Sequence, residues 1–320
     1  MTTPPVSGAF EGLNLEGRRR ESSALRAQQE QAPSVATLRL QEGDARELDW
    51  LPDKSVHLVV TSPPYWTLKQ YNDTPGQLGH IEAYEEFLDE LDRVWRHAYR
   101  ALVPGGRLVC VVGDVCLSRR EHGRHLVMPL HADIAVRCRK IGFDNLNPII
   151  WLKIANASFE VEGGGKFLGK PYEPNAIVKN DMEFILMQRK PGGYRTPSEN
   201  QRKLSMIDKD KFDAWFRQTW TLTGASTREH PAPYPLELAD RLVRMFSFVG
   251  DTVLDPFAGT GTTLVAAGQA QRNAIGVEID PNYLALAADR LGKVGNLFHQ
   301  AEVDIVRATP KQGRRQPRAK

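Results

Sequence analysis

A strand, a glycine-rich turn and the start of a helix follow one another in DTVLDPFAGTGTT, residues 251–263. About twenty residues after the turn, the next predicted strand ends in an acid, Glu278. Gly259 and Gly261 let the backbone approach a ligand because no Cβ stands in the way. A carboxylate at a strand end can accept two hydrogen bonds from ribose hydroxyls. The pattern indicates a nucleoside site, with plain packing of the turn as the equally good alternative.

Two absences narrow the kind of nucleoside. The dinucleotide pattern GxGxxG fails because Leu264-Val265 stands where a glycine is required. The P-loop pattern fails because no lysine precedes Thr262. A nucleoside with little phosphate, such as S-adenosylmethionine, therefore fits the turn better than NAD or ATP.

Strands and helices alternate on both sides of an irregular segment. The alternation predicts right-handed βαβ units and a mainly parallel sheet, and therefore an α/β fold. Residues 154–226 interrupt it with several glycines and prolines, which indicates a lid, an insertion or a recognition region. The expected strands are 36–40, 55–60, 107–112, 148–152, 183–188, 251–254 and 274–277, and the expected helices are 84–102, 130–141, 236–248, 262–269 and 282–291.

A second motif, Thr61-Ser-Pro-Pro-Tyr-Trp66, ends the predicted strand 55–60, because two prolines cannot continue a central strand. It falls at the carboxyl edge of the sheet, where open α/β folds bind ligands. The prolines fix the backbone, so the Pro63 carbonyl can point outward beside the Ser62 hydroxyl, and Tyr65 offers a flat ring face. Two acceptors beside an aromatic ring suit the exocyclic amino group of a flipped base. A Pro-Pro turn with a buried tyrosine is the alternative.

These motifs resemble the amino-methyltransferases of DNA, which methylate cytosine N4 or adenine N6. A catalytic motif before the cofactor motif is the order of their circularly permuted β group. The resemblance covers residues 38–292 and includes LVPGG at 102–106, WLK at 151–153 and HPAPYP at 230–235. It implies the S-adenosylmethionine-dependent methyltransferase fold, a circularly permuted Rossmann-like sheet with an inserted target-recognition region, as in the cytosine-N4 enzymes of restriction–modification systems.

The resemblance implies a site, residue by residue, and no metal. Glu278 would bind the ribose of the cofactor. Asp44 would lie near the adenine, although a turn at the end of a strand explains it equally well. The catalytic residues would be Ser62, Pro63, Pro64 and Tyr65. The other residues implied for S-adenosyl-L-methionine are His230, Pro231, Asp255, Pro256, Phe257, Gly259, Thr260, Gly261 and Thr262.

The chain divides accordingly. Its first 35 residues are rich in proline, glycine, serine and glutamine, and we expect a disordered leader there. By the resemblance, 36–153 is the catalytic half and 227–295 the cofactor-binding half of the methyltransferase domain. Residues 154–226 are the target-recognition region, and 296–320 are a basic C-terminal tail.

The implied reaction is direct methyl transfer to N4 of cytosine in duplex DNA, after base flipping. Ser62 favours cytosine because the family's adenine enzymes tend to carry Asp or Asn at this position. Adenine N6, and an RNA or a protein amide as the substrate, stay open as alternatives. Methylation at cytosine C5 needs a cysteine nucleophile, and none of Cys110, Cys116 and Cys138 follows a proline, so we exclude it.

Overall charge does not by itself point to nucleic acid. The 320 residues carry 42 Lys and Arg against 39 Asp and Glu, a net charge of +3, and five of the bases fall in the last ten residues. The sequence contains no run of about 18 apolar residues, no secretory signal and no metal-ligand spacing of cysteines. We expect a cytoplasmic protein whose partner is double-stranded DNA, with a homodimer and a companion restriction endonuclease left open.

Some surface and core positions complete the expectations. The basic residues of 154–226 are candidate DNA contacts, although a solvated surface is the better expectation for any single one: Lys166, Lys170, Lys179, Arg189, Arg195, Arg202 and Lys203. We expect Trp215 and Trp220 in the core. Leu88, Leu91 and Trp95 share one face of the helix 84–102, where packing within the chain is favoured over a dimer contact.

Overall fold

The computed structural model of the chain describes residues 35–69, 71–153, 174, 178, 180–225, 234–296 and 299–307. The expected disordered leader lies outside the described residues except for Val35, as do the five bases of the basic tail. No helix within the described ranges is long and apolar enough to cross a bilayer.

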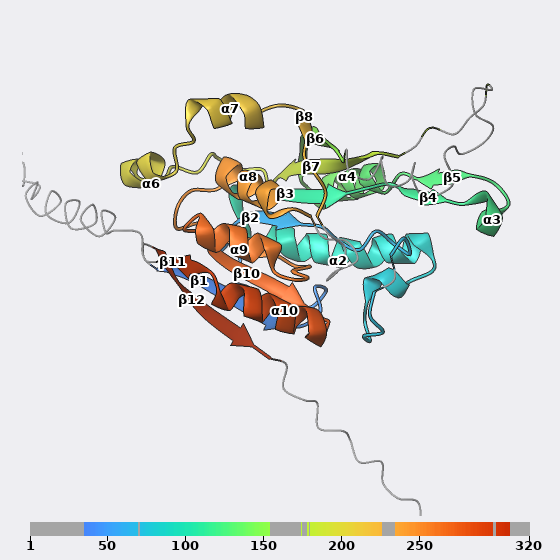
Figure 1. Ribbon diagram of the computed structural model, residues 1–320, viewed down its shortest axis with the longest axis horizontal. Coiled ribbons are helices and arrows are strands. Elements are labelled where there is room, and N and C mark those ends of the chain that lie inside the picture. Colours follow the sequence, from blue (N-terminus) through green and yellow to red (C-terminus); the bar gives the residue numbers. More distant parts are fainter. Residues whose placement is uncertain are drawn as a thin grey trace, which may run out of the picture. The chain divides into compact units, whose positions relative to one another are not determined.

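A ten-stranded sheet, in the order β11-β12-β1-β10-β9-β2-β3-β7-β6-β8, organises the described part of the chain (Figure 1). Every pair from β12 through to β3 is parallel, whereas β7 runs antiparallel to both of its neighbours. The expected mainly parallel α/β sheet is therefore confirmed. The strands are β1 (Ala36–Glu42), β2 (Val56–Thr61), β3 (Leu102–Val112), β6 (Asp144–Leu152), β7 (Met182–Arg189), β8 (Thr219–Thr221), β9 (Thr252–Asp255), β10 (Asn273–Glu278), β11 (Gly295–Asn296) and β12 (His299–Val306).

Helices cover both faces of this sheet (Figure 1). One apolar cluster joins the sheet to α8 (Leu236–Phe246), α9 (Thr262–Gln269) and α10 (Pro281–Gly292). A second cluster joins the opposite face to α2 (Tyr84–Ala101) and α4 (Leu130–Ile141). Along β2, Leu58 and Val60 belong to the first cluster and Val59 to the second. Central strands buried on both faces explain the uninterrupted apolar runs of the sequence.

The expected helix 84–102 ends one residue early because Leu102 already pairs with Val56 of β2. The Pro104-Gly105-Gly106 stretch, expected to separate helix from strand, lies inside β3 as an irregularity in its pairing with β2. Gly105 has φ +79°, and a Cβ there would lie 2.6 Å from the Gly193 carbonyl oxygen. The close approach of two backbones therefore requires glycine at this position.

Two strands lie in ranges for which the sequence indicated other roles. β7, from the expected target-recognition region, lies between β3 and β6. Its residues Ile185–Gln188 are all buried, as the middle of a central strand requires. β12, from the expected tail, pairs in parallel with β1. The sheet therefore extends into both ranges, because each supplies a segment with apolar residues to bury.

The rest of the irregular segment contributes small elements. They are α6 (Glu199–Leu204), α7 (Lys209–Trp215) and β8, and Trp215 and Trp220 are buried as expected. A separate two-stranded hairpin, which the sequence did not suggest, consists of β4 (Val115–Leu117) and β5 (Leu126–Met128), with the short helix α3 (Arg119–His122) between them. A 3₁₀ turn, η1 (Leu78–His80), precedes α2.

Leu88, Leu91 and Trp95 of α2 are buried within the chain, which confirms packing as their role. Replacing Leu91, which is fully buried, by alanine should lower the free energy of unfolding by about 2–5 kcal/mol through lost burial and a residual cavity. Urea unfolding measures the change. Leu204→Ala, at a position 44% exposed, is the matched control and should change little. Equal effects of the two substitutions would contradict the packing described for α2.

Candidate functional site

A cavity of about 580 Å³ lies at the carboxyl ends of β1, β2, β9 and β10. Seven of the residues expected from the sequence border it: Asp44, Ser62, Pro64, Pro256, Phe257, Gly259 and Glu278. Two others, His230 and Pro231, lie outside the described residues.

The sheet order explains how motifs almost two hundred residues apart share one cavity. Leu58 and Val59 of β2 pair in parallel with Val253 and Leu254 of β9. Neighbouring parallel strands end at the same edge, so the loop after β2 and the turn after β9 must meet there. The cavity therefore joins the proline motif to the glycine-rich turn.

Asp255 connects the two motifs physically. Thr61 Oγ1 donates a hydrogen bond to Asp255 Oδ1 at 2.7 Å, and the Phe257 backbone N–H donates to the same oxygen at 3.1 Å. Thr263 Oγ1 and Tyr234 Oη donate to Oδ2 at 2.5 and 3.3 Å. Burial raises the pKa of the Asp255 carboxyl. Asp255 is not among the residues that line the cavity; it ties the ends of β2 and β9 together, and its expected contact with the cofactor stays a prediction.

Three other residues expected at the cofactor, Thr260, Gly261 and Thr262, are not among those that line the cavity and contact α10. Arg290 Nη1 donates to the Thr260 carbonyl at 2.7 Å, to Thr260 Oγ1 at 2.8 Å and to Thr262 Oγ1 at 3.2 Å. Gly261 has φ +79°, and a Cβ there would lie 3.2 Å from Ala287 Cβ. Close packing of the turn on α10 therefore explains Gly261, which was the alternative weighed from the sequence.

Glu278 ends β10 at the cavity with 7% of its surface exposed. The Gly259 backbone N–H donates to Oε2 at 2.7 Å, and the Asp280 backbone N–H donates to Oε1 at 2.8 Å. Burial raises the pKa of Glu278 to about 7, although these two N–H groups oppose the shift. Each carboxylate oxygen can accept a further hydrogen bond, so Glu278 can bind a pair of hydroxyls.

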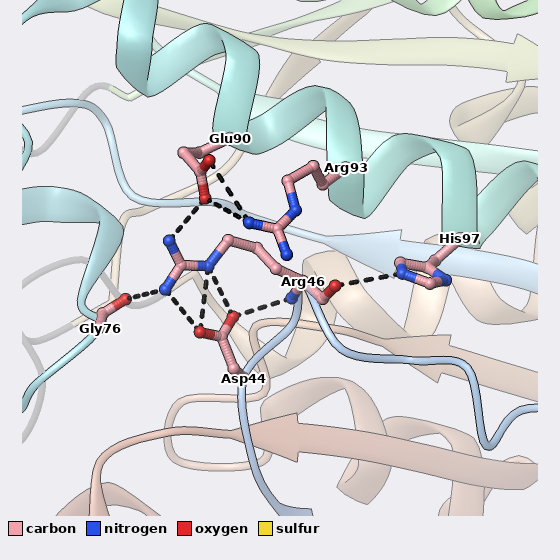
Figure 2. A network of polar contacts seen from close by, with 6 residues as sticks. All are labelled: Asp44, Arg46, Gly76, Glu90, Arg93 and His97. Atoms are coloured by element: carbon pink, nitrogen blue, oxygen red, sulfur yellow. Dashed lines mark hydrogen bonds and ion pairs between the residues drawn. The ribbon is translucent and has the colours of Figure 1, made fainter.

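Asp44 follows β1 and lies in a network of polar contacts (Figure 2). Arg46 Nη2 lies 2.5 Å from Asp44 Oδ2, and its Nη1 lies 2.6 Å from Glu90 Oε2 on α2. Arg46 Nη2 also donates to the Gly76 carbonyl at 3.1 Å. Asp44 therefore serves as a turn residue that orients Arg46, and it also borders the cavity. Its expected place near the adenine stays a prediction.

The loop between β2 and α2 covers one side of the cavity and is held at several points. Besides the Arg46 contact with Gly76, Thr74 Oγ1 donates to Asp280 Oδ2 at 2.6 Å. Trp66 Nε1 donates to the Ile81 carbonyl at 2.9 Å, and the Trp66 ring packs edge-on against Tyr84. Trp66 is 9% exposed, so it anchors this loop.

A chain of hydroxyl groups runs from the proline motif to a carboxylate. Ser62 Oγ donates to Tyr65 Oη at 3.2 Å, and Tyr65 Oη donates to Glu183 Oε2 at 3.0 Å. Lys153 Nζ forms an ion pair with Glu183 Oε1. Burial, together with the nearby Glu183, raises the pKa of Tyr65, so its hydroxyl stays protonated. A carboxylate can only accept hydrogen bonds, so the Tyr65 hydroxyl must donate to Glu183, and the Ser62 hydroxyl can then donate to Tyr65. The lone pairs of Ser62 Oγ are left free to accept a hydrogen bond.

Sequence reasoning missed several of these contacts. Arg46 and Glu183 carry no motif signal in a single sequence, because their partners Glu90 and Tyr65 lie 44 and 118 residues away. Thr61 belongs to the proline motif, but its partner Asp255 lies 194 residues away, so no contact was expected for it. Lys153 was noted only as part of the WLK resemblance.

The described candidates for DNA contact lie away from the cavity. Arg189 pairs in register with Asp144, the first residue of β6, and also forms an ion pair with it. Arg195 forms an ion pair with Asp251, which immediately precedes β9. Lys203 pairs with Glu199 on the surface of α6, and Arg202 Nε donates to the Pro197 carbonyl at 3.4 Å. Lys166, Lys170 and Lys179 lie outside the described residues.

Comparison with known proteins gives consistent matches along the chain. A family model described as DNA methylase matches residues 56–289. The chain is 37% identical over 280 residues to the Type II methyltransferase M.MjaI of Methanocaldococcus jannaschii, covering 78% of this chain and 89% of the relative. It is 34% identical over 287 residues to M.MthZI of Methanothermobacter thermautotrophicus, covering 82% and 79%.

Solved structures also resemble this chain, among them the following two. One is a proposed DNA modification methylase of Thermus thermophilus, solved in complex with S-adenosyl-L-methionine. It is 55% identical, has a TM-score of 0.71 and covers 85% of this chain and 99% of its own. The other is the PvuII DNA methyltransferase, which is cytosine-N4-specific. At 22% identity, a TM-score of 0.60 and coverage of 82% and 89%, its likeness concerns the fold alone.

The contact between Thr61 and Asp255 can be tested by stability. Thr61→Val removes the hydroxyl that donates to the buried carboxylate while keeping the shape of the side chain. It should lower the free energy of unfolding by about 1–3 kcal/mol, because Asp255 loses a hydrogen-bond donor. Denaturant unfolding measures this. Thr219→Val, at an exposed position of β8, is the control. An unchanged stability of Thr61→Val would show that the contact contributes nothing.

Proposed function

The chain belongs to the DNA methylase family, and we propose on this premise that it transfers a methyl group from S-adenosyl-L-methionine to N4 of cytosine in duplex DNA. One observation carries the proposal. Ser62 and Pro64 border the same cavity as Glu278, so a hydrogen-bond acceptor for an amino group and an acceptor for ribose hydroxyls share one space. Ser62 at the head of the proline motif supports cytosine over adenine by the family resemblance.

The residues that line the cavity fit the cofactor in their chemistry. Glu278 would accept hydrogen bonds from the ribose, Phe257 and Pro256 would supply apolar contacts, and Asp44 would lie near the adenine. When bound, S-adenosyl-L-methionine supplies an electrophilic methyl group on a sulfonium.

The chain's own residues must make the base nitrogen reactive. An exocyclic amino nitrogen is a poor nucleophile because its lone pair is delocalised into the ring. Ser62 Oγ would accept a hydrogen bond from this group, because its own hydrogen points to Tyr65. The Pro63 carbonyl accepts no hydrogen bond from the described residues and would be the second acceptor. Two acceptors of this kind localise the lone pair on nitrogen, and the fixed loop aligns it for attack.

Glu183 acts in this scheme as a positioning residue. Through Tyr65 it fixes the direction of the Ser62 hydroxyl hydrogen, and Lys153 stabilises its charge. With its hydroxyl held at one end, the ring of Tyr65 has a set orientation for stacking on the base. Stacking of this kind contributes on the order of 1–3 kcal/mol. The amino proton can leave after methyl transfer, so the scheme demands no strongly basic group.

The cysteines support nitrogen over carbon as the methylated atom. Cys110 and Cys138 are buried, and burial raises the pKa of both thiols. A buried neutral thiol is a poor nucleophile. Cys116 is exposed on β4, outside the proline motif.

We keep the division of the chain as part of the proposal. Residues 36–153 and 227–295 would form the catalytic and cofactor-binding halves, and parts of 154–226 outside β7 would contribute to target recognition. Residues 296–320 would act as a basic tail only beyond β12. This assignment follows the order of motifs along the sheet.

The proposal is tested by the bases found in DNA from cells that express the protein. Nucleosides from digested DNA, separated and identified by mass, should include N4-methylcytosine, and sequencing of the methylated DNA should return one recognition site. N6-methyladenine in its place would overturn the choice of base. Methyl label from the cofactor in RNA or protein, and none in DNA, would overturn the substrate.

Two substitutions test the hydroxyl chain. Ser62→Ala should keep cofactor affinity and lower kcat roughly 100-fold, since an acceptor for the amino group is lost. Glu183→Gln should lower kcat roughly tenfold with cofactor and DNA affinities unchanged, because an amide can donate to Tyr65 and reverse the hydroxyl direction. Single-turnover methylation measures both. Glu86→Gln, at an exposed position of α2, is the control. Wild-type kcat in Glu183→Gln would rule out its positioning role.

Glu278 predicts a pH dependence of cofactor binding. Ribose hydroxyls donate to the ionised carboxylate, whose pKa is raised to about 7, so affinity should rise with pH and level off above this value. Binding should be about tenfold weaker at pH 6 than at pH 8 if only the carboxylate form binds. Calorimetric titration with S-adenosyl-L-methionine measures the dissociation constant. Glu278→Gln should bind the cofactor more weakly than the wild type, with an affinity that does not change with pH. If the affinity of this variant changed with pH as steeply as that of the wild type, another group would be responsible for the pH dependence.

A further inference from the structure

We propose that the β4–α3–β5 hairpin is an arm that binds the DNA phosphate backbone next to the target base; this rests on the proposed function. The hairpin forms a two-stranded sheet separate from the central one. It projects beyond the sheet at the right of Figure 1. The sequence offered no motif for it, and no expectation placed a DNA contact between residues 115 and 128.

The charge of the arm is concentrated at its tip. Residues 118–125 contain Arg119, Arg120 and Arg124, together with two histidines, against a single glutamate. The three arginines are exposed, and within the described part of the chain none of them forms an ion pair with a carboxylate. Arginines on the neighbouring helices differ, since Arg100 and Arg137 are each paired with aspartates. Unpaired, exposed guanidinium groups are suited to phosphate.

The base of the arm is firmly attached. A two-stranded hairpin alone is barely stable in water, but Val115 is 1% exposed, and Leu117 and Met128 pack against the second apolar cluster. Asp114 Oδ1 lies 2.6 Å from His131 Nδ1, which joins the two ends of the segment. Basic residues therefore extend from a fixed point.

The base of the arm lies next to the proline motif. β3 ends at Val112, and a Cβ at Gly113 would lie 3.4 Å from the Tyr65 ring and 3.2 Å from Glu183 Cγ. The His131 ring stacks on Phe184, next to Glu183, with centroids 3.6 Å apart. Arg120 follows Val115 by five residues, so their Cα atoms are at most about 17 Å apart. Base pairs are stacked 3.4 Å apart, so this distance corresponds to about five base pairs. The tip can therefore contact phosphates close to the base held at Ser62.

The arm also lies at a different edge of the sheet from two of the basic residues that the sequence suggested as DNA contacts. Arg189 and Arg195 lie at the amino edge of the sheet and are paired with aspartates. A duplex that presents a base to Ser62 must approach the carboxyl edge. The arm offers unpaired positive charge on that edge, so DNA is a better partner for it than an acidic protein surface elsewhere.

The test is the salt dependence of DNA binding. Arg119, Arg120 and Arg124 are replaced together by glutamine, and binding of a fluorescein-labelled mixed-sequence duplex of about 30 base pairs is followed by anisotropy. Each phosphate contact contributes about 0.9 to the slope of log affinity against log salt. The triple variant should lose about two to three units of slope and bind roughly tenfold or more weakly near physiological salt, while its recognition sequence stays unchanged.

Two matched variants accompany it. In the first, the same three arginines are changed to lysine, which keeps the charge and should keep the slope of log affinity against log salt. If the guanidinium groups had a structural role instead, this variant would lose affinity as well. Lys54, which precedes β2, and Arg139 and Lys140, which precede β6, are exposed at the amino edge, and their joint change to glutamine removes the same charge far from the cavity. This control should bind like the wild type. Unchanged melting temperature and cofactor affinity show that each variant is folded.

A wild-type slope in the glutamine arm variant overturns the inference. If the slope is unchanged and the variant also loses a self-association that the wild type shows on gel filtration, the arm contacts a second copy of the protein. That outcome overturns the inference as well. Failure of the proposed function gives a different result, because the wild-type protein would then place no methyl group in DNA. Binding to a mixed-sequence duplex needs no turnover, so the two outcomes are measured independently.

Discussion

The buried carboxylate of Asp255 is the contact on which the rest of the site depends. A buried carboxyl group needs hydrogen-bond donors, and those around Asp255 come from both halves of the chain: Thr61 on one side, and Phe257, Thr263 and Tyr234 on the other. Thr61 immediately precedes Ser62, and Phe257 borders the cavity. Satisfying one buried group therefore fixes the proline motif relative to the glycine-rich turn.

Two further carboxylates, Glu278 and Glu183, have different roles in the site. Glu278 borders the cavity, is held by two backbone N–H groups and has a raised pKa, so its charge responds near neutral pH. Glu183 stands behind Tyr65, is paired with Lys153 and orients hydroxyl groups without bordering the cavity. The partners of each group, more than its residue type, determine whether it binds a ligand or positions another side chain.

The two edges of the sheet have different properties. At the carboxyl edge lie the cavity, the proline motif and the base of the basic hairpin. At the amino edge, Arg189 is paired with Asp144 and Arg195 with Asp251. A net charge of +3 is therefore compatible with a DNA enzyme, because what matters is the local charge next to the site.

The sequence alone determined the α/β class, most of the strands and helices, and the two motifs, since local periodicity and proline and glycine positions encode these directly. It also determined the resemblance from which Ser62 and Glu278 were assigned. Only the tertiary structure decided that Asp255 joins strands, that Gly261 packs against Ala287, that β7 enters the sheet, and that Glu183 reaches Tyr65. Each of these depends on residues far apart in the chain, and their proximity follows from strand order, which no local pattern contains.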